Sequence, residues 1–275
     1  TACHNLFFAE GVSRITMDGV TVRGAKAVSG WGAGIYIRVG QGEAQRHSIT
    51  DCTSIDNDGS GLEGFDLRNL DVSGGRYETN GSNGIRLNNH DPSFARKIRN
   101  VNVRDTTCSN NGGSGIGIGN CIVDNNISGP ARLYGYTNME ASDIVISGNT
   151  CVGNAIYGIY CSAIRVSIIG NTTRTNGLPG GQNGGICSNS QYLTVQGNVA
   201  ENNEGFGIDV GASQYATIIG NLSRHNTWTG MTVEANINTA VIGNRLYDNG
   251  PTNSVQLQAW RHGGDGFGNY FPNII

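Results

Sequence analysis

Residues 195–210 read VQGNVAENNEGFGIDV, and residues 218–233 repeat the pattern as IIGNLSRHNTWTGMTV. In each stretch a β-branched residue leads into Gly-Asn, and a second asparagine follows five residues after the first. A glycine with an apolar neighbour stands four residues further on, as Gly207 in one stretch and Gly230 in the other, 23 residues apart. A fixed period of this length predicts a solenoid, in which each repeat contacts mainly its neighbours.

The glycine with its following apolar residue recurs through most of the chain at a basic period of about 22 residues, lengthened where loops are inserted. Apolar residues alternate after it, as in Gly84-Ile-Arg-Leu-Asn88, which is the period of a β-strand. Glycine and asparagine tolerate left-handed backbone angles and so turn the chain between short strands. The repeat therefore predicts an all-β parallel β-helix with strands about 4.8 Å apart. The recurring glycines, called anchor glycines below, are Gly34, Gly64, Gly84, Gly115, Gly158, Gly185, Gly207 and Gly230.

The composition agrees with a scaffold rich in turns and excludes several classes of protein. Glycine supplies 43 of 275 residues, but five prolines and no strict glycine period exclude a collagen triple helix. No apolar run approaches the roughly 20 residues that span a bilayer, so we expect no membrane insertion. A net charge of −3 indicates no nucleic acid partner. Seven cysteines without a CxxC pair predict buried thiols rather than a zinc site, with Cys108 and Cys151 in one column. We expect no cofactor, with calcium at 56–59 as the alternative.

The motifs quoted above resemble the right-handed parallel β-helix proteins of the pectate-lyase superfamily, in the short-repeat form of mannuronan C5-epimerases and phage tailspikes. The resemblance covers about residues 12–260 and implies a single right-handed β-helix domain over residues 1–275 with about nine coils. It also implies that the asparagine columns form internal amide ladders. We expect the protein to be extracellular, secreted or virion-associated, with an extended polysaccharide as its partner. The chain begins at Thr-Ala-Cys-His, and we expect it to be an excerpt of a longer protein.

Counting from the anchor glycines predicts two columns of outward side chains, each a short floor on which a polymer can lie. The first column lies two residues after each anchor, and the second lies four residues after it. The first holds Tyr36, Asp66, Arg86, Gly117, Tyr160, Cys187, Asp209 and Thr232. The second holds Arg38, Arg68, Asn88, Gly119, Ser162, Asn189, Gly211 and Glu234.

The early coils carry the first candidate site. Uronic-acid lyases and epimerases remove the proton beside the sugar carboxyl group, which requires a base and a cation to neutralise the carboxylate. We predict that His90 takes the proton, that Arg68 and Arg86 hold the carboxylate, and that Asp66 completes the site. The alternative is a structural ion pair between Asp66 and Arg86. Arg38, Asn88 and Asp91 are predicted to bind the substrate.

The resemblance to the epimerases bears on the same segment. Those enzymes carry Tyr-Gly-Phe-Asp-Pro-His on a strand of this kind, and Gly64-Phe65-Asp66-Leu67-Arg68 is similar to that element. Leu67 stands where the family has proline, Arg68 where it has histidine, and Glu63 or Leu62 where it has tyrosine. The family's second aspartate falls at Asn88, and His90 is the candidate substitute for the missing histidine.

The late coils carry an alternative site. Asp209 and Glu234 are predicted to lie one coil apart and two residues out of register, a separation of roughly 8 Å that suits an inverting glycoside hydrolase. Trp260 would stack on a sugar ring. An inserted loop over residues 120–142 is predicted to form one side of the saccharide groove, with Tyr134 and Tyr136 against the sugar. The open functional alternatives are thus a lyase or C5-epimerase, a hydrolase, and a non-catalytic glycan-binding tailspike or adhesin shaft, for which a homotrimer is expected.

Overall fold

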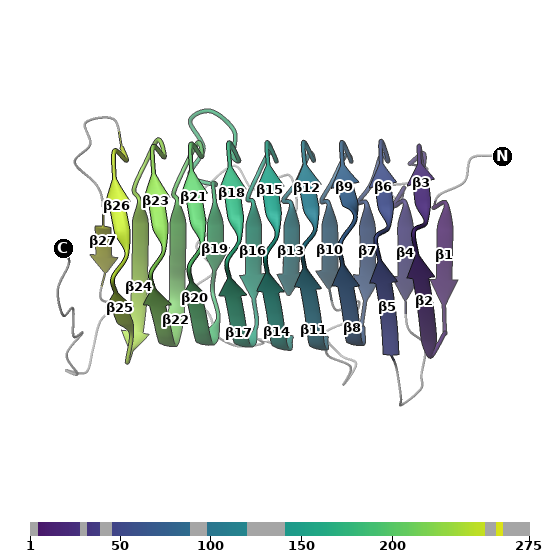
Figure 1. The fold of residues 1–275 in the computed structure, drawn as a ribbon, viewed down its shortest axis with the longest axis horizontal. Coiled ribbons are helices and arrows are strands. Elements are labelled where there is room, and N and C mark those ends of the chain that lie inside the picture. The colour runs from purple at the N-terminus through teal and green to yellow at the C-terminus, as the bar shows by residue number, and fades with distance from the viewer. Residues whose placement is uncertain are drawn as a thin grey trace.

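The computed structural model of the chain describes residues 5–27, 32–38, 46–88, 98–119, 141–250 and 257–260. These residues wind into a right-handed β-helix whose coils stack side by side along one axis (Figure 1). Each coil contributes three strands, and every strand pairs in parallel with its counterparts on the neighbouring coils. Nine coils are complete, which confirms the predicted fold class. The described residues include no helix long and apolar enough to cross a membrane.

Row 1, which carries the site described below, contains the strands that follow the anchor glycines, together with β1 and β27 at its two ends. They are β1 (Phe7–Glu10), β4 (Ile35–Arg38), β7 (Leu62–Phe65), β10 (Ile85–Asn88), β13 (Ile116–Gly119), β16 (Ile159–Ser162), β19 (Ile186–Ser188), the first half of β22 (Ile208–Ile219), β24 (Met231–Ile237) and β27 (Leu257–Trp260).

Rows 2 and 3 complete each coil. Row 2 contains β2 (Arg14–Asp18), β5 (Arg46–Thr50), β8 (Arg68–Ser73), β11 (Arg99–Arg104), β14 (Ser142–Ser147), β17 (Ile164–Ile169), β20 (Gln191–Gln196), the second half of β22 and β25 (Ala240–Ile242). Row 3 contains β3 (Thr21–Arg23), β6 (Thr53–Ile55), β9 (Arg76–Glu78), β12 (Thr107–Ser109), β15 (Thr150–Val152), β18 (Thr172–Arg174), β21 (Val199–Glu201), β23 (Leu222–Arg224) and β26 (Arg245–Tyr247).

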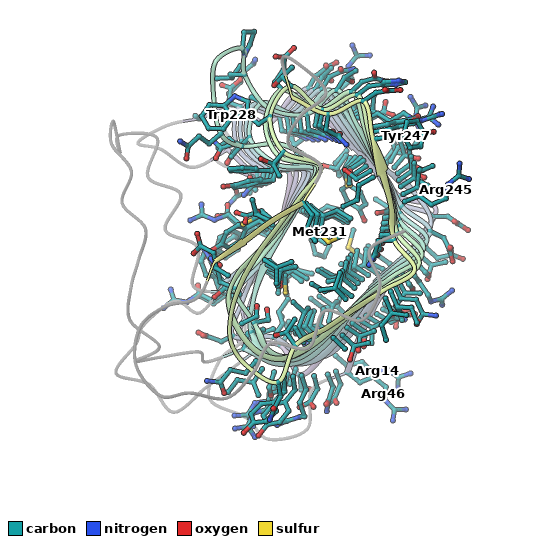
Figure 2. All side chains as sticks on the ribbon, turned by 90° about the vertical axis from the view of Figure 1, so that its left-hand side faces the viewer. Arg14, Arg46, Trp228, Met231, Arg245 and Tyr247 are labelled. Carbon is teal, nitrogen blue, oxygen red and sulfur yellow. The ribbon has the colours of Figure 1, made fainter. Side chains whose placement is uncertain are left out.

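The core is a set of stacked columns, because each strand turns alternate side chains inward and the next coil repeats them in register. Figure 2 looks along the stack and shows Met231 inside it, with Arg14, Arg46 and Arg245 pointing outward. Most inward positions are isoleucine, leucine or valine and are almost completely buried. Cys108 and Cys151 are in-register partners and both are fully buried, as predicted.

Two buried asparagine ladders run beside this core at the corners, and they confirm the predicted amide columns. In each ladder a side-chain nitrogen donates to the side-chain oxygen of the asparagine one coil on, as Asn154 does to Asn176 at 2.8 Å. The glycines before the second ladder take left-handed angles, with φ of 61° at Gly197 and 63° at Gly220. The first ladder contains Asn57, Asn80, Asn111, Asn154, Asn176, Asn203, Asn226 and Asn249. The second contains Asn149, Asn171, Asn198, Asn221 and Asn244.

The third coil corrects the predicted register. Leu62, and not Phe65, pairs with Ile35 and Ile85 on the two neighbouring coils. The anchor glycine of this coil is therefore Gly61, whereas Gly64 occupies an inward position. The physical reason is a tight corner in which Leu67 turns into the core: a Cβ on Gly64 would meet Leu67 Cδ1 at 2.4 Å.

The predicted inserted loop at 120–142 falls mainly on residues 120–140, outside the described residues, and Ser142 already begins β14.

Candidate functional site

The outward side chains of row 1 form one continuous strip across the coils, called the row-1 face below. With the corrected register, Tyr36, Glu63 and Arg86 are in-register neighbours on β4, β7 and β10. The same column continues through Gly117, Tyr160, Cys187, Asp209 and Thr232. The predicted column is thus correct except at its second member, where Glu63 replaces Asp66.

Glu63 and Arg86 form an ion pair on this face, with the glutamate deeply buried. Arg86 Nη1 donates to Glu63 Oε1 at 3.1 Å, and the glutamate side chain is only 9% exposed against 33% for the arginine. Burial raises the pKa of Glu63, and the neighbouring positive charge of Arg86 opposes that rise without cancelling it. A carboxyl group held this way exchanges its proton closer to neutral pH than an exposed glutamate does, which suits a general base or acid.

Asn88 adds a polar contact to Arg86. In the amide orientation that satisfies both of its polar atoms, Asn88 donates to the Gly119 carbonyl and accepts from Arg86 Nε at 3.2 Å. Arg86 is therefore held by Glu63 on one side and by Asn88 on the other. Its planar fork is fixed on the face, and one-third of the Arg86 side chain is still exposed.

Aromatic rings flank the pair toward the N-terminal end. Tyr36 stacks on Phe8 with ring centroids 5.2 Å apart and contacts Phe65 at 5.7 Å. Burial raises the pKa of Tyr36 to about 12. Arg38, at the end of β4, pairs with Glu10 at 3.2 Å. Phe8 is 57% exposed, so the strip ends in an accessible aromatic ring.

The other predicted residues of the first site separate into two groups. Asp66 is buried at the corner after β7, with φ of 58°, and its backbone nitrogen donates to the Asn88 carbonyl at 3.1 Å. Arg68 begins β8 and pairs in register with Arg99, so it belongs to row 2 and not to the predicted column. The predicted alternative, an ion pair between Asp66 and Arg86, is wrong, because Arg86 pairs with Glu63. His90, Asp91, Tyr134 and Tyr136 lie outside the described residues.

The alternative site also lies on the row-1 face, four coils after Arg86. Asp209 pairs in register with Thr232 on β24, which confirms that Glu234 is two residues out of register with it. The Asp209 carboxylate accepts hydrogen bonds from the Thr232 hydroxyl and, at 3.7 Å, from the Cys187 thiol. Trp260 is the in-register partner of Glu234 on β27. The predicted separation of the two carboxyl groups stays a prediction.

Tyrosines adjoin this second cluster. The rings of Tyr157 and Tyr160 lie 5.7 Å apart. Burial raises the pKa of Tyr157 far above its usual value, and Cys187 and Asp209 contribute to the rise. The Tyr157 hydroxyl therefore stays protonated near neutral pH and is not suited to act as a base.

The acidic groups of the suggested calcium segment already have partners within the chain. Asp56 lies 2.7 Å from Arg23 and accepts from Thr79, while Asp58 lies 3.3 Å from Lys26 and accepts from the Ala27 backbone. Asn57 belongs to the asparagine ladder. Within the described ranges there is no group of three or more His, Cys, Asp or Glu side chains suited to a metal ion. A calcium role stays an untested prediction.

Glu63 is the site residue that the sequence argument missed, and a signal for it was present. Elsewhere an asparagine stands four residues before the anchor glycine, as Asn80 does before Gly84. Asn57 stands in the same relation to Gly61, which places Glu63 two residues later on the outer face.

A family model described as a right handed beta helix region matches residues 119–271. Among solved structures, the A-module of the Azotobacter vinelandii mannuronan C-5 epimerase AlgE4 aligns with a TM-score of 0.63 at 16% identity, covering 91% of this chain and 63% of that one. The periplasmic alginate epimerase AlgG aligns with a TM-score of 0.67 at 14% identity, covering 93% and 61%. The AlgE6 A-module of Azotobacter vinelandii aligns at 0.53 and 15%, covering 94% and 62%. No curated protein sequence matches the chain.

This chain therefore spans less than two thirds of the length of those structures. At these identities the likeness concerns the fold alone.

Proposed function

The chain belongs to the family of right-handed β-helix proteins, and from that premise we propose that it binds an extended acidic polysaccharide along the row-1 face and removes the proton beside a sugar carboxyl group. The observation that carries the proposal is the pair of Glu63 and Arg86, in which a buried carboxyl group with a raised pKa lies 3.1 Å from a partly exposed guanidinium. The pair combines the base and the cation that this chemistry needs.

The reaction follows from the two groups. The carboxylate of a bound uronic acid draws the Arg86 guanidinium away from Glu63. The carboxylate and the guanidinium then form a bidentate pair. Ionised Glu63 then accepts the proton from the carbon beside the sugar carboxyl group, and the electron pair of the broken C–H bond moves into that carboxyl group. Arg86 neutralises the charge that develops there. Loss of the glycosidic oxygen at the next carbon gives a lyase product, and return of a proton to the opposite face of the sugar gives an epimer.

His90, which the sequence predicts as the base, is proposed instead as the second proton donor of an epimerase, or as the acid that protonates the leaving oxygen in a lyase. Asp66 and Arg68 remain supporting candidates, since Asp66 lies beside the Asn88 backbone and Arg68 begins the next strand. The named neighbours AlgE4 and AlgG, a mannuronan C-5 epimerase and an alginate epimerase, support a polysaccharide as the partner through their shared fold.

Hydrolysis by Asp209 and Glu234 is the second candidate, because both lie on strands of the same face and Asp209 is held by two donors. Binding without chemistry, as in a tailspike or adhesin shaft, is the third. In that case the pair of Glu63 and Arg86 only orients an acidic sugar.

The test is to incubate the protein with uronic-acid polysaccharides in heavy water. Deuterium at the carbon beside the carboxyl group reports an epimerase, which returns a solvent proton to that carbon, whereas ultraviolet absorbance from the new double bond reports a lyase, whose unsaturated product keeps no hydrogen there. Glu63→Gln is expected to lower whichever of these two signals the wild type gives by about 10²-fold or more, and Arg86→Ala by a similar factor. Glu78→Gln, which alters a carboxylate paired with Arg76 on row 3, is the matched control. New reducing ends with neither deuterium nor the double-bond absorbance indicate the hydrolase, and binding with none of these products indicates the binder.

A further inference from the structure

An arginine begins the row-2 strand on each of four consecutive coils. Arg14 begins β2, Arg46 begins β5, Arg68 begins β8 and Arg99 begins β11. Arg14 is the in-register partner of Arg46, and Arg68 is the in-register partner of Arg99. Between the two pairs, β8 has one additional residue, Asn69, before its first pair with β5. These four arginines are called the arginine column below.

The arginine column lies on the surface of the β-helix. Arg14, Arg46 and Arg99 are exposed, and Arg68 is half-buried. Figure 2 shows Arg14 and Arg46 pointing away from the core at an outer edge of the coil. Neighbouring strands are about 4.8 Å apart, so each in-register pair brings two like charges together, which costs stability. An anion that lies across the guanidinium groups offsets this cost.

The scaffold itself does not require arginine at this position. The in-register residues on β14, β17, β20 and β22 are Ser142, Ile164, Gln191 and Gln214. The strands of row 2 pair in the same way on these later coils, although the position carries no charge there. The arginines are thus confined to the early coils, and the coils of Arg68 and Arg99 are those that carry Glu63 and Arg86 in row 1.

The acidic groups that adjoin the column leave it with an excess of positive charge. Hydrogen bonds from Arg165, at 2.5 and 2.8 Å, lower the pKa of Asp143, and the charge of Arg99 adds to the effect, so two arginines share this carboxylate. Asp71, further along β8, pairs with Arg104 at 3.1 Å. The segments 39–45, 89–97 and 120–140 precede row-2 strands and lie outside the described residues. In sequence they hold four acidic and three basic residues, a formal charge of −1 against +4 in the column: Glu43, Asp91, Asp124, Glu140, Arg96, Lys97 and Arg132.

We propose that the arginine column is a second binding strip for an acidic polysaccharide, separate from the row-1 site. A strip on another row can hold a distant stretch of the polymer whose acidic sugar lies at Arg86. Two linked contacts to one polymer bind more tightly than either contact alone. The identity of the polymer rests on the proposed function. Nucleic acid is the other polyanion that arginines bind, and the net charge of −3 on the whole chain disfavours it.

The test measures the affinity of the protein for polymannuronate and polygalacturonate, with duplex DNA as a competing probe. The column triple variant, Arg14→Gln, Arg46→Gln, Arg99→Gln, is expected to bind the uronate polymers about tenfold more weakly than wild type at low ionic strength. Near 1 M salt, where charges are screened, the loss is expected to fall to about twofold. Arg68 is kept because it is half-buried. Glutamine already occupies this position on β20 and β22, so the variant is expected to unfold at or above the wild-type temperature.

The matched control is the row-3 triple variant Arg23→Gln, Arg76→Gln, Arg245→Gln, which removes the same charge from another face. Equal losses in the two triple variants, or no binding of either uronate polymer by wild type, overturn the binding strip. Duplex DNA that binds more tightly than both polymers, with a loss in the column triple variant, overturns the polysaccharide as its occupant. The proposed function is judged separately: it fails if Glu63→Gln keeps the wild-type deuterium exchange or double-bond absorbance, whatever the column triple variant shows.

Discussion

Glu63 Oε1 lies 3.1 Å from Arg86 Nη1 across neighbouring coils, and the glutamate is the more deeply buried partner. Because of this pairing, the protonation state of Glu63 decides whether the Arg86 guanidinium is engaged by the glutamate or available to a ligand. When Glu63 holds a proton, the charge of Arg86 is free for an acidic ligand; when Glu63 is ionised, it is available to take a proton. The same relation makes a prediction for stability.

Glu63→Gln is expected to gain stability relative to wild type as the pH rises. Burial raises the pKa of Glu63 in the folded protein. A group with a raised pKa contributes stability that is fully present below its pKa in the unfolded chain and is lost as the pH rises through its pKa in the folded protein. Glutamine does not ionise and has no such loss. Urea unfolding of both proteins at several pH values between about 4 and 8 gives the comparison. If wild type instead gains stability relative to Glu63→Gln as the pH rises, the ion pair with Arg86 outweighs the cost of burial.

The fold was predictable from the sequence because its determinants are local and repeated. Gly-Asn turns, ladder asparagines and alternating apolar residues recur in almost every coil, so the strands assigned in one coil predict those of the next. The third coil misleads for a physical reason: Gly64 is followed by an apolar residue like an anchor, but it lies inward to make room for Leu67. Reading Asn57 with Gly61 removes the ambiguity.

The site was only partly predictable, because chemistry depends on which side chains share a face. Arg86 and Asn88 were placed correctly on β10, but one register error exchanged Glu63 for Asp66. The burial that raises the pKa of Glu63 comes from packing between coils and has no signature in the sequence.

His47→Leu is expected to stabilise the protein, most of all in mild acid. His47 is 1% exposed between the in-register residues Ile15 and Leu70, and neither ring nitrogen has a hydrogen-bond partner among the described residues. Replacing an unsatisfied buried polar group by an apolar one gains about 1 kcal/mol at pH 7.

The pH dependence of that variant has a definite sign. Burial lowers the pKa of His47 below 6.5. The contribution of His47 to stability is present above its pKa in the unfolded chain and is lost as the pH falls through its lower pKa in the folded protein. Wild type should therefore lose more stability than His47→Leu on acidification, as measured by thermal unfolding. The exposed His225→Gln serves as the control, and parallel pH curves for wild type and His47→Leu would contradict the prediction.

Asn154→Ala is expected to destabilise the protein by about 3 kcal/mol. Asn154 is fully buried; its side-chain nitrogen donates to Asn176 at 2.8 Å and to the Cys108 carbonyl at 3.0 Å, and its oxygen accepts from Asn111 at 2.9 Å. Truncation leaves several buried groups unpaired, each costing roughly 1–3 kcal/mol. Chemical denaturation gives the value. Asn102→Ala, which loses one half-buried bond to Asp71, is expected to cost less than about 1 kcal/mol.

Gly117 offers a direct test of the path of the polysaccharide. It lies on the row-1 face between Arg86 and Tyr160, and among the described residues a Cβ there would approach nothing closer than the Asn83 side chain at 3.7 Å. Gly117→Ala should therefore leave stability within about 0.5 kcal/mol of wild type. Gly117→Trp places a bulky ring between the two halves of the face and is expected to weaken glycan binding about tenfold or more, close to 1.4 kcal/mol.

Two controls make the Gly117 result specific. Gly117→Ala separates the loss of backbone freedom from the added bulk, and Thr217→Trp places the same ring at an exposed position on row 2. Binding is compared by affinity electrophoresis and folding by thermal unfolding. If Gly117→Trp binds as tightly as Thr217→Trp, the polymer does not cross the fifth coil, because a continuous chain from Arg86 to Asp209 must pass over that position.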